Sequence, residues 1–128
     1  MVLNPECVRA TMLAIESFSF GERCKMCQLI EKPELSGYSE EEVQYTCLKL
    51  LEAGYIEATT MRALRSPIQI ASVSDLTYSG HEFLNTVRSD KNWKKVKETS
   101  KAAGIFSLKG LAEIGKQVAA AAITAALQ

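Results

Sequence analysis

The stretch SEEEVQYTCLKLLEAGYIE, residues 39–57, decides how this chain folds. Ser39 and Glu42 match the S-x-x-E capping box, in which each side chain satisfies an orphan backbone donor at a helix start. Gly54 follows the last turn, where a left-handed residue is least costly. The pattern predicts a capped amphipathic helix that leads directly into a β-strand. Its buried stripe is expected at Val43, Cys47, Leu50 and Leu51.

Length and composition indicate one domain with its own core, since the chain has 128 residues and 47% hydrophobic side chains. Fifteen basic and fifteen acidic residues give no net charge, so binding to nucleic acid would need a local patch. The N-terminal residues show no signal-peptide pattern, and the uncharged stretch 117–128 is too short to cross a bilayer. Four cysteines without a secretory signal favour reduced thiols. We therefore expect a cytoplasmic protein with no membrane partner.

The N-terminal third of the sequence predicts one helix, followed by a segment whose secondary structure the pattern leaves open. Asn4, Pro5 and Glu6 provide an N-cap, a first-turn proline and a first-turn acid. A buried stripe then runs through about Ser17. Residues 18–38 are left open between helix and strand, and residues 27–30 favour a short strand. The expected stripe is Cys7, Val8, Thr11, Met12 and Ile15.

The chain after Gly54 predicts a β-hairpin followed by helices. Arg65 is expected at the hairpin tip, and we refer to the hairpin loop with its flanking strand ends as the wing. The later helices begin at caps supplied by Thr77, Asp90 and Ser107, and Gly104 ends one of them. The expected segments are strand 55–61, turn 63–67, strand 68–76, and helices 78–88, 91–103 and 108–127.

Two blocks resemble a known family: GYSEEEVQY…LKLLEAGYIEA (Gly37–Ala58) and LTYSGHEFLNTVRSDKNWKKVKE (Leu76–Glu98). The family consists of small bacterial and phage-borne proteins known only as a domain of unknown function with a winged-helix-like core. The resemblance runs from about residue 1 to 103, and the spacing of Asp90 and Trp93 is its most specific part. The L-T-x-x-G-x-x-F-L run also resembles the helix after the wing in many winged-helix regulators.

The resemblance and the helix–glycine–strand pattern together lead to an α+β fold. We expect a winged-helix-like domain at residues 1–103 and a C-terminal helical extension at residues 104–128. The resemblance implies no activity, because the family has none established.

Enzyme and metal chemistry find little support in the residues. Cys24 and Cys27 form a C-x-x-C that would suit half a zinc site or a redox pair. Cys7 and Cys47, however, lie on expected apolar stripes, where cysteine acts as a small hydrophobe. His81 lacks a neighbouring nucleophile, and the acids at residues 40–42 are explained by the dipole of the helix that they begin. We expect no catalytic residue, metal or cofactor.

Nucleic-acid binding is the sharper hypothesis. In a helix-turn-helix docking, Gln44 near the start of the 39–54 helix would lie in the major groove and read adenine. Residues 31–57 oppose this, because seven acids against two lysines give a net charge of −5. Residues 88–101 carry six basic and two acidic side chains, a net charge of +4, although a solvated helix face with Trp93 in the core is the simpler explanation. The candidate contacts are Gln44, Lys49, Arg62, Arg65, Lys94, Lys97 and Lys101.

The last helix predicts self-association, because small and apolar residues recur on it at helical spacing. It either folds back on the core or pairs with a second protomer. The candidate dimer contacts are Leu111, Gly115, Val118, Ala119, Ala122 and Ala126. Two functions follow: a small non-catalytic bacterial or prophage regulator that contacts DNA, or a protein-interaction and dimerisation module that does not.

Overall fold

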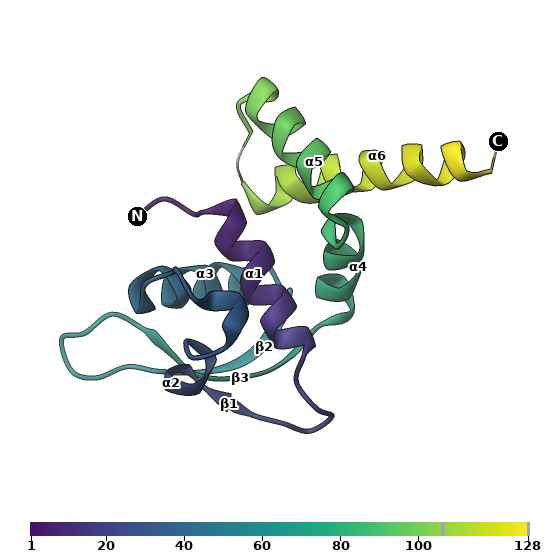
Figure 1. The fold of residues 1–128 in the computed structure, drawn as a ribbon. Coiled ribbons are helices and arrows are strands. Elements are labelled where there is room, and N and C mark those ends of the chain that lie inside the picture. The colour runs from purple at the N-terminus through teal and green to yellow at the C-terminus, as the bar shows by residue number, and fades with distance from the viewer. Residues whose placement is uncertain (106, 128) are drawn as a thin grey trace. The chain divides into compact units, whose positions relative to one another are not determined.

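The computed structural model describes residues 1–105 and 107–127 (Figure 1). Within them the chain is α+β, with six α-helices, one 3-10 turn and a three-stranded antiparallel sheet. The elements are α1 (Pro5–Glu16), β1 (Cys24–Lys25), α2 (Met26–Leu29), the 3-10 turn η1 (Pro33–Leu35), α3 (Glu40–Glu52), β2 (Ile56–Met61), β3 (Gln69–Leu76), α4 (Tyr78–Val87), α5 (Asp90–Ala103) and α6 (Leu108–Ala126).

The chain packs into two compact units, residues 1–81 and 82–128, which divide within α4. The first unit holds the sheet with α1, α2 and α3, and the second holds α5 and α6. The predicted division into a winged-helix-like domain at residues 1–103 and a helical extension at residues 104–128 stays a prediction.

The starts of α1 and α3 confirm the two predicted N-caps. Asn4 Oδ1 accepts a hydrogen bond from the Glu6 N–H at 3.0 Å, and Ser39 Oγ accepts one from the Glu42 N–H at 3.2 Å. The Glu42 carboxylate does not follow the predicted capping box. It accepts from Asn4 Nδ2 at 2.8 Å, so it ties the first turn of α3 to the cap of α1.

The end of α3 confirms the predicted glycine stop. Gly54 has a φ of 78°, in the left-handed region, and the Tyr55 N–H donates to the Leu50 carbonyl at 2.9 Å. This six-to-one bond is the mark of a Schellman motif. The chain therefore leaves α3 in a fixed direction and enters β2 two residues later.

The T-x-x-G start of α4 fits against this same turn. The Thr77 N–H donates to the Tyr55 carbonyl at 3.0 Å, and the Thr77 hydroxyl donates to the Gly54 carbonyl at 2.5 Å. A Cβ at Gly80 would lie only 2.1 Å from the Tyr55 carbonyl oxygen. Glycine is required there because backbone occupies the space that a side chain would need.

The sheet has the strand order β1-β3-β2. The β2–β3 hairpin is confirmed, and its register runs from Ile56 opposite Leu76 to Met61 opposite Gln69 with two shifts. β1 pairs with β3 only at Val73 and Ser72.

The strand predicted at residues 27–30 is wrong, because the strand lies earlier, at residues 24–25, and α2 follows it at once. Met26 and Leu29 are the buried residues of this short helix. Periodicity does not distinguish a four-residue helix from a strand.

The core of the first unit lies between α1, α3 and the sheet, which lie side by side in Figure 1. Cys7 and Cys47 are fully buried in it, as the apolar stripes predicted. The other large contributors include Val8, Met12, Ile15, Val43, Leu50, Ile70 and Val73.

The second unit confirms two predicted helix boundaries and corrects a third. Gly104 ends α5 with a φ of 70°, and Ser107 Oγ caps α6 by accepting from the Gly110 N–H at 3.1 Å. The cap of α5 is Ser89, whose hydroxyl accepts from the Asn92 N–H at 3.1 Å, and not Asp90. Asp90 occupies the first helical position, where its charge complements the helix dipole.

Candidate functional site

The first turn of α3 is acidic and does not present a base-reading surface. Glu40 and Glu41 are exposed, whereas Glu42 is partly buried and bonded to Asn4. The exposed carboxylates would face phosphate in a major-groove docking and oppose binding.

Gln44 is engaged inside the protein. Its Nε2 donates to the Ile70 carbonyl at 3.1 Å, and its Oε1 accepts from the Ile70 N–H at 2.9 Å. The amide edge that would read adenine is therefore used on β3, which argues against the predicted role of Gln44 in base recognition.

Lys49 is also held by neighbours on α3. Its ammonium lies 3.1 Å from a Glu52 carboxylate oxygen and 5.4 Å from the centroid of the Tyr45 ring. Hydrogen bonding to Glu52, helped by the charge of that carboxylate, raises the pKa of Lys49. Lys49 lies nearly three helical turns from the Ser39 cap, so it offers at most one cation at the far end of an acidic surface.

Both predicted arginines of the wing, Arg62 and Arg65, are exposed. Arg65 has a φ of 61°, in the left-handed region, which fits its predicted place in the turn. Arg62 Nε donates to the Ser66 carbonyl at 3.3 Å across the loop. Leu64 between them is 92% exposed, so the tip combines two cations with an open apolar side chain.

The exposed side of α5 is the largest basic surface that the sequence predicted. Trp93, Val96 and Ser100 are buried, which confirms that the tryptophan ring lies in the core. The Lys97 ammonium lies 5.6 Å from the centroid of that ring. The exposed lysines of α5 are Lys91, Lys94, Lys95 and Lys101.

The candidate nucleic-acid contacts thus divide between the two units. Residues 1–81 hold seven basic and eleven acidic side chains, a net charge of −4. Residues 82–128 hold eight basic and four acidic side chains, a net charge of +4. The wing arginines belong to the acidic unit, and the α5 lysines belong to the basic one.

The thiols of Cys7, Cys24 and Cys47 are buried, and only Cys27 is exposed. Burial raises the pKa of the Cys47 thiol to about 12, with a smaller contribution from Cys7. Burial also raises the pKa of Cys24, against the opposing charge of Lys32. These thiols stay protonated at neutral pH, which fits a structural role.

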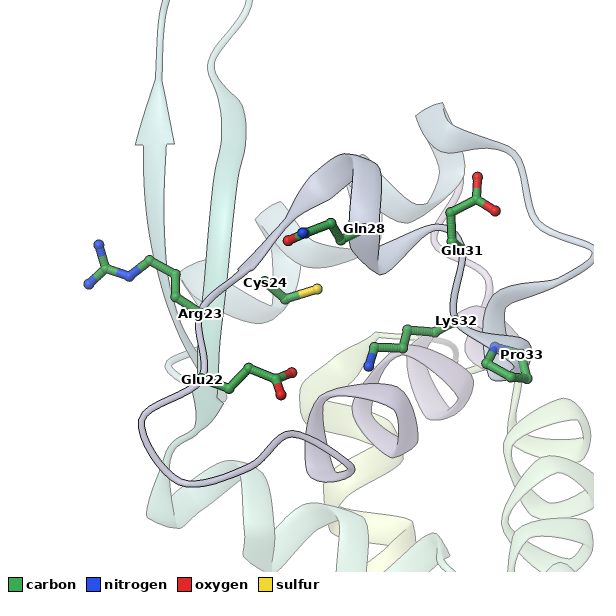
Figure 2. Close-up of a pocket in the computed structure, with 7 residues that line it drawn as sticks. All are labelled: Glu22, Arg23, Cys24, Gln28, Glu31, Lys32 and Pro33. Atoms are coloured by element: carbon green, nitrogen blue, oxygen red, sulfur yellow. The ribbon is translucent and has the colours of Figure 1, made fainter.

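Cys24, the first cysteine of the C-x-x-C, lines a small pocket of about 390 Å³ on the β1–α2 side (Figure 2). In Figure 2 the Cys24 sulfur and the Lys32 ammonium point into this pocket, whereas Arg23 and Glu31 point away. Across the described ranges 1–105 and 107–127, no three histidine, cysteine, aspartate or glutamate side chains gather as metal ligands would.

A larger cleft, which the sequence did not reveal, lies between α2, the start of α3 and β3. Its volume is about 730 Å³. Four separate stretches of chain form it, so no local pattern marks it. The lining residues are Arg23, Lys25, Met26, Cys27, Gln28, Glu40, Gln44, Met61, Gln69, Ile70, Ala71 and Ser72.

The predicted dimer contacts on α6 separate into an internal and an external set. Leu111 and Gly115 are buried, and a Cβ at Gly115 would lie 2.4 Å from Thr86 Oγ1. These two residues pack within the second unit and are not available to a partner. Val118, Ala119 and Ala122 are half-buried and Ala126 is exposed.

The distal end of α6 and its C-cap also expose two large apolar side chains. Ile123 is 61% exposed and Leu127 is 83% exposed. A homodimer through this end stays a prediction. In the part of the chain that the structure describes, no helix has the length and apolar character needed to cross a membrane.

In architecture the chain is an α+β protein with a small antiparallel sheet. By sequence it belongs to the DUF2513 family, described as a hypothetical protein, whose model matches residues 2–106. It is also 32% identical over 120 residues to an uncharacterized protein of Haemophilus influenzae, covering 92% of this chain and 95% of that protein. No solved structure matches. The resemblance to a family of unknown function is confirmed.

Proposed function

We propose that this protein is a small non-catalytic regulator built on a winged-helix domain, and that it contacts nucleic-acid phosphates through α5. The order α1-β1-α2-α3-β2-β3 with strand order β1-β3-β2 supports the winged-helix assignment, because such domains use this arrangement. The arginines of the wing supply a second, smaller contact.

The observation that carries the proposal is the exposed lysine side of α5. Lys91, Lys94 and Lys101 are exposed on a helix whose opposite side is buried in the core of the second unit. Such a row is positioned to neutralise phosphates and release their counterions. Asp90 and Glu98 on the same helix reduce the field without cancelling it, since the unit keeps a net charge of +4.

The acidic start of α3 and the engaged Gln44 make direct base reading a poor basis for this binding. Contacts to phosphate carry no sequence information by themselves. The proposed contact is therefore sequence-independent and strongly dependent on salt.

The test is fluorescence anisotropy with a labelled 20-base-pair duplex of arbitrary sequence at several salt concentrations. The variant Lys91→Gln/Lys94→Gln/Lys101→Gln should bind at least about 10-fold more weakly at 50 mM salt. Its slope of log affinity against log salt should fall by up to about 2.7, because each phosphate contact contributes about 0.9.

The matched control is Lys49→Gln/Lys109→Gln/Lys116→Gln, which removes the same charge from exposed or paired lysines elsewhere. The affinity of this variant for the duplex should lie within about 3-fold of that of the parent protein if the position of the lysines, and not the net charge, determines binding. Absence of duplex binding by the parent protein at 50 mM salt, or equal losses in both variants, would exclude the α5 surface.

The second candidate is a protein-interaction module that does not bind DNA. It is favoured by the net charge of −4 on the first unit and by the α3 side chains that are engaged internally. The same titration separates the two candidates, because the module alone gives no salt-dependent duplex binding.

A further inference from the structure

β3 extends beyond its neighbour β1. β1 pairs only with Val73 and Ser72, and the chain turns into α2 at Met26. The part of β3 at residues 69–71 therefore lies beside β2 on one side and has no described strand on the other. An unpaired strand edge of this kind is a template for another chain.

The Gln44 side chain occupies part of that edge. Its amide makes both hydrogen bonds that the Ile70 backbone offers, at 2.9 and 3.1 Å. Two residues directly opposite in an antiparallel ladder exchange the same pair of bonds. The side chain thus stands where a peptide group of a further strand would lie, and it keeps the edge satisfied while no such strand is present.

The 730 Å³ cleft opens beside this edge. Its floor is apolar, with Ile70 and Met26 buried beneath it and Met61 half-exposed at its side. Methionine side chains adapt to differently shaped apolar partners. The floor spans β3 residues 69–72, which at about 3.3 Å per residue fits four or five residues of extended chain.

The charges around the cleft indicate which side chains a partner should carry. Arg23 and Lys25 are exposed lining residues, against a single lining acid, Glu40. This local excess of cations lies within a unit whose net charge is −4. An acidic partner is therefore attracted to the cleft and repelled by most of the surrounding surface.

We propose that this cleft binds an extended segment of a partner protein in which acidic and apolar residues alternate. The segment adds along β3 at residues 69–71 and replaces the Gln44 amide at the Ile70 backbone. Because side chains alternate along a strand, the apolar ones pack on Met26 and Met61 while the acidic ones face Arg23 and Lys25. The site lies in the first unit and is separate from the nucleic-acid contact proposed for α5.

The probe is a labelled, end-capped heptapeptide of alternating glutamate and valine, added to the full-length protein. Titration followed by two-dimensional amide NMR should move the Ile70 backbone signal and the Gln44 side-chain signals together. A peptide N-methylated at alternate positions cannot form the ladder bonds and should bind at least 10-fold more weakly. The lysine–valine analogue should be weakened to a similar extent.

Charge reversal supplies the matched pair of variants. Arg23→Glu/Lys25→Glu should lose at least 10-fold in affinity for the glutamate peptide and gain affinity for the lysine peptide. Arg62→Glu/Arg65→Glu makes the same charge change on the wing, outside the cleft, and should change affinity less than 3-fold. All four side chains are exposed, so both variants should fold.

Three results would overturn the proposal: Ile70 and Gln44 signals that stay fixed at millimolar peptide, equal binding of the N-methylated peptide, or equal losses in the two charge-reversal variants. Movement of the same signals by duplex DNA would assign the cleft to nucleic acid instead. The variant Lys91→Gln/Lys94→Gln/Lys101→Gln should keep full peptide affinity, so failure of the α5 contact and failure of the cleft are distinguishable.

Discussion

α3 and α5 are built in the same way and present opposite surfaces. Each begins at a serine cap, Ser39 or Ser89, and each ends at a left-handed glycine, Gly54 or Gly104. Each buries one stripe in the core of its own unit. The exposed first turn of α3 is acidic, whereas most of the exposed charged side chains of α5 are lysines.

The difference lies in where the polar side chains find partners. On α3, Glu42 bonds to Asn4, Gln44 bonds to Ile70, and Lys49 pairs with Glu52. These bonds engage, within the first unit, side chains that could otherwise recognise a ligand. On α5, lysines 91, 94, 95 and 101 extend into solvent, which leaves their charge available to a ligand. The position of α3 in the chain is therefore not enough to make it a helix that recognises bases.

The largest expected effect is on the free energy of unfolding at alkaline pH, through a buried thiol that α3 carries. Burial raises the pKa of the Cys47 thiol on α3 to about 12, against 9.0 for the thiol in the unfolded chain. A group whose folded pKa is raised contributes stability below its unfolded pKa, and that contribution is lost as pH rises. Between pH 8 and pH 10, stability should fall by about 1.4 kcal/mol through this thiol, since one pKa unit corresponds to about 1.36 kcal/mol.

Urea unfolding at pH 8 and pH 10 checks this expectation. Cys47→Ala should lose less stability than the parent protein over that interval, even though its stability at pH 8 is lower. Cys27→Ala, which removes an exposed thiol, should keep the parental pH dependence. The same slope in Cys47→Ala and the parent protein would contradict a buried, protonated thiol on α3.

Replacing Gly54 or Gly104 should cost the same free energy of unfolding, because both helices end in the same way. Gly54 and Gly104 have φ values of 78° and 70°, and a Cβ at either position meets no atom within 4 Å. Replacing either glycine with alanine should lower the free energy of unfolding by about 1 kcal/mol through backbone strain alone. The measurement is urea unfolding at pH 7 of the single variants.

Gly80→Ala provides the contrast, because its Cβ would meet the Tyr55 carbonyl oxygen at 2.1 Å. It should cost clearly more than either terminal glycine, since backbone cannot move aside as a side chain can. A Gly54→Ala cost as large as that of Gly80→Ala would show that the end of α3 depends on more than its φ.

The features that sequence could predict are those encoded within one turn of helix or one hairpin. The caps at Asn4, Ser39 and Ser107 and the stops at Gly54 and Gly104 all depend on residues within five positions, and the structure confirms them. The predicted cap at Asp90 is wrong because Ser89 beside it is an equally good candidate, and only the backbone distinguishes them.

The features that sequence could not predict join residues far apart in the chain. The Glu42–Asn4 bond spans 38 residues and the Gln44–Ile70 bonds span 26. A glutamate three residues after a serine fits a capping box, and a glutamine on the outer side of a helix fits a base contact, until the tertiary neighbours are known. The cleft beside β3 is hidden for the same reason, because four separate segments form it.

The smallest expected effect is on duplex affinity, when charge is removed from the acidic first turn of α3. Glu40→Gln/Glu41→Gln removes two exposed negative charges. If α3 stays away from the nucleic acid, duplex affinity at 50 mM salt should rise only about 2-fold, through long-range electrostatics, and the gain should disappear at 200 mM salt. The matched control, Glu31→Gln/Glu34→Gln, removes two exposed acids elsewhere in the same unit and should give a similar gain.

Larger changes would reverse the interpretation of α3. A gain above 10-fold would mean that the acidic turn lies against phosphates in the complex, and a loss would mean that a carboxylate contacts a base such as cytosine. Either result, with only a small gain in the control, would make α3 a recognition helix that contacts the nucleic acid through its acidic turn. Equal small gains in both variants would leave α5 as the surface that binds nucleic acid and α3 as a helix of the core.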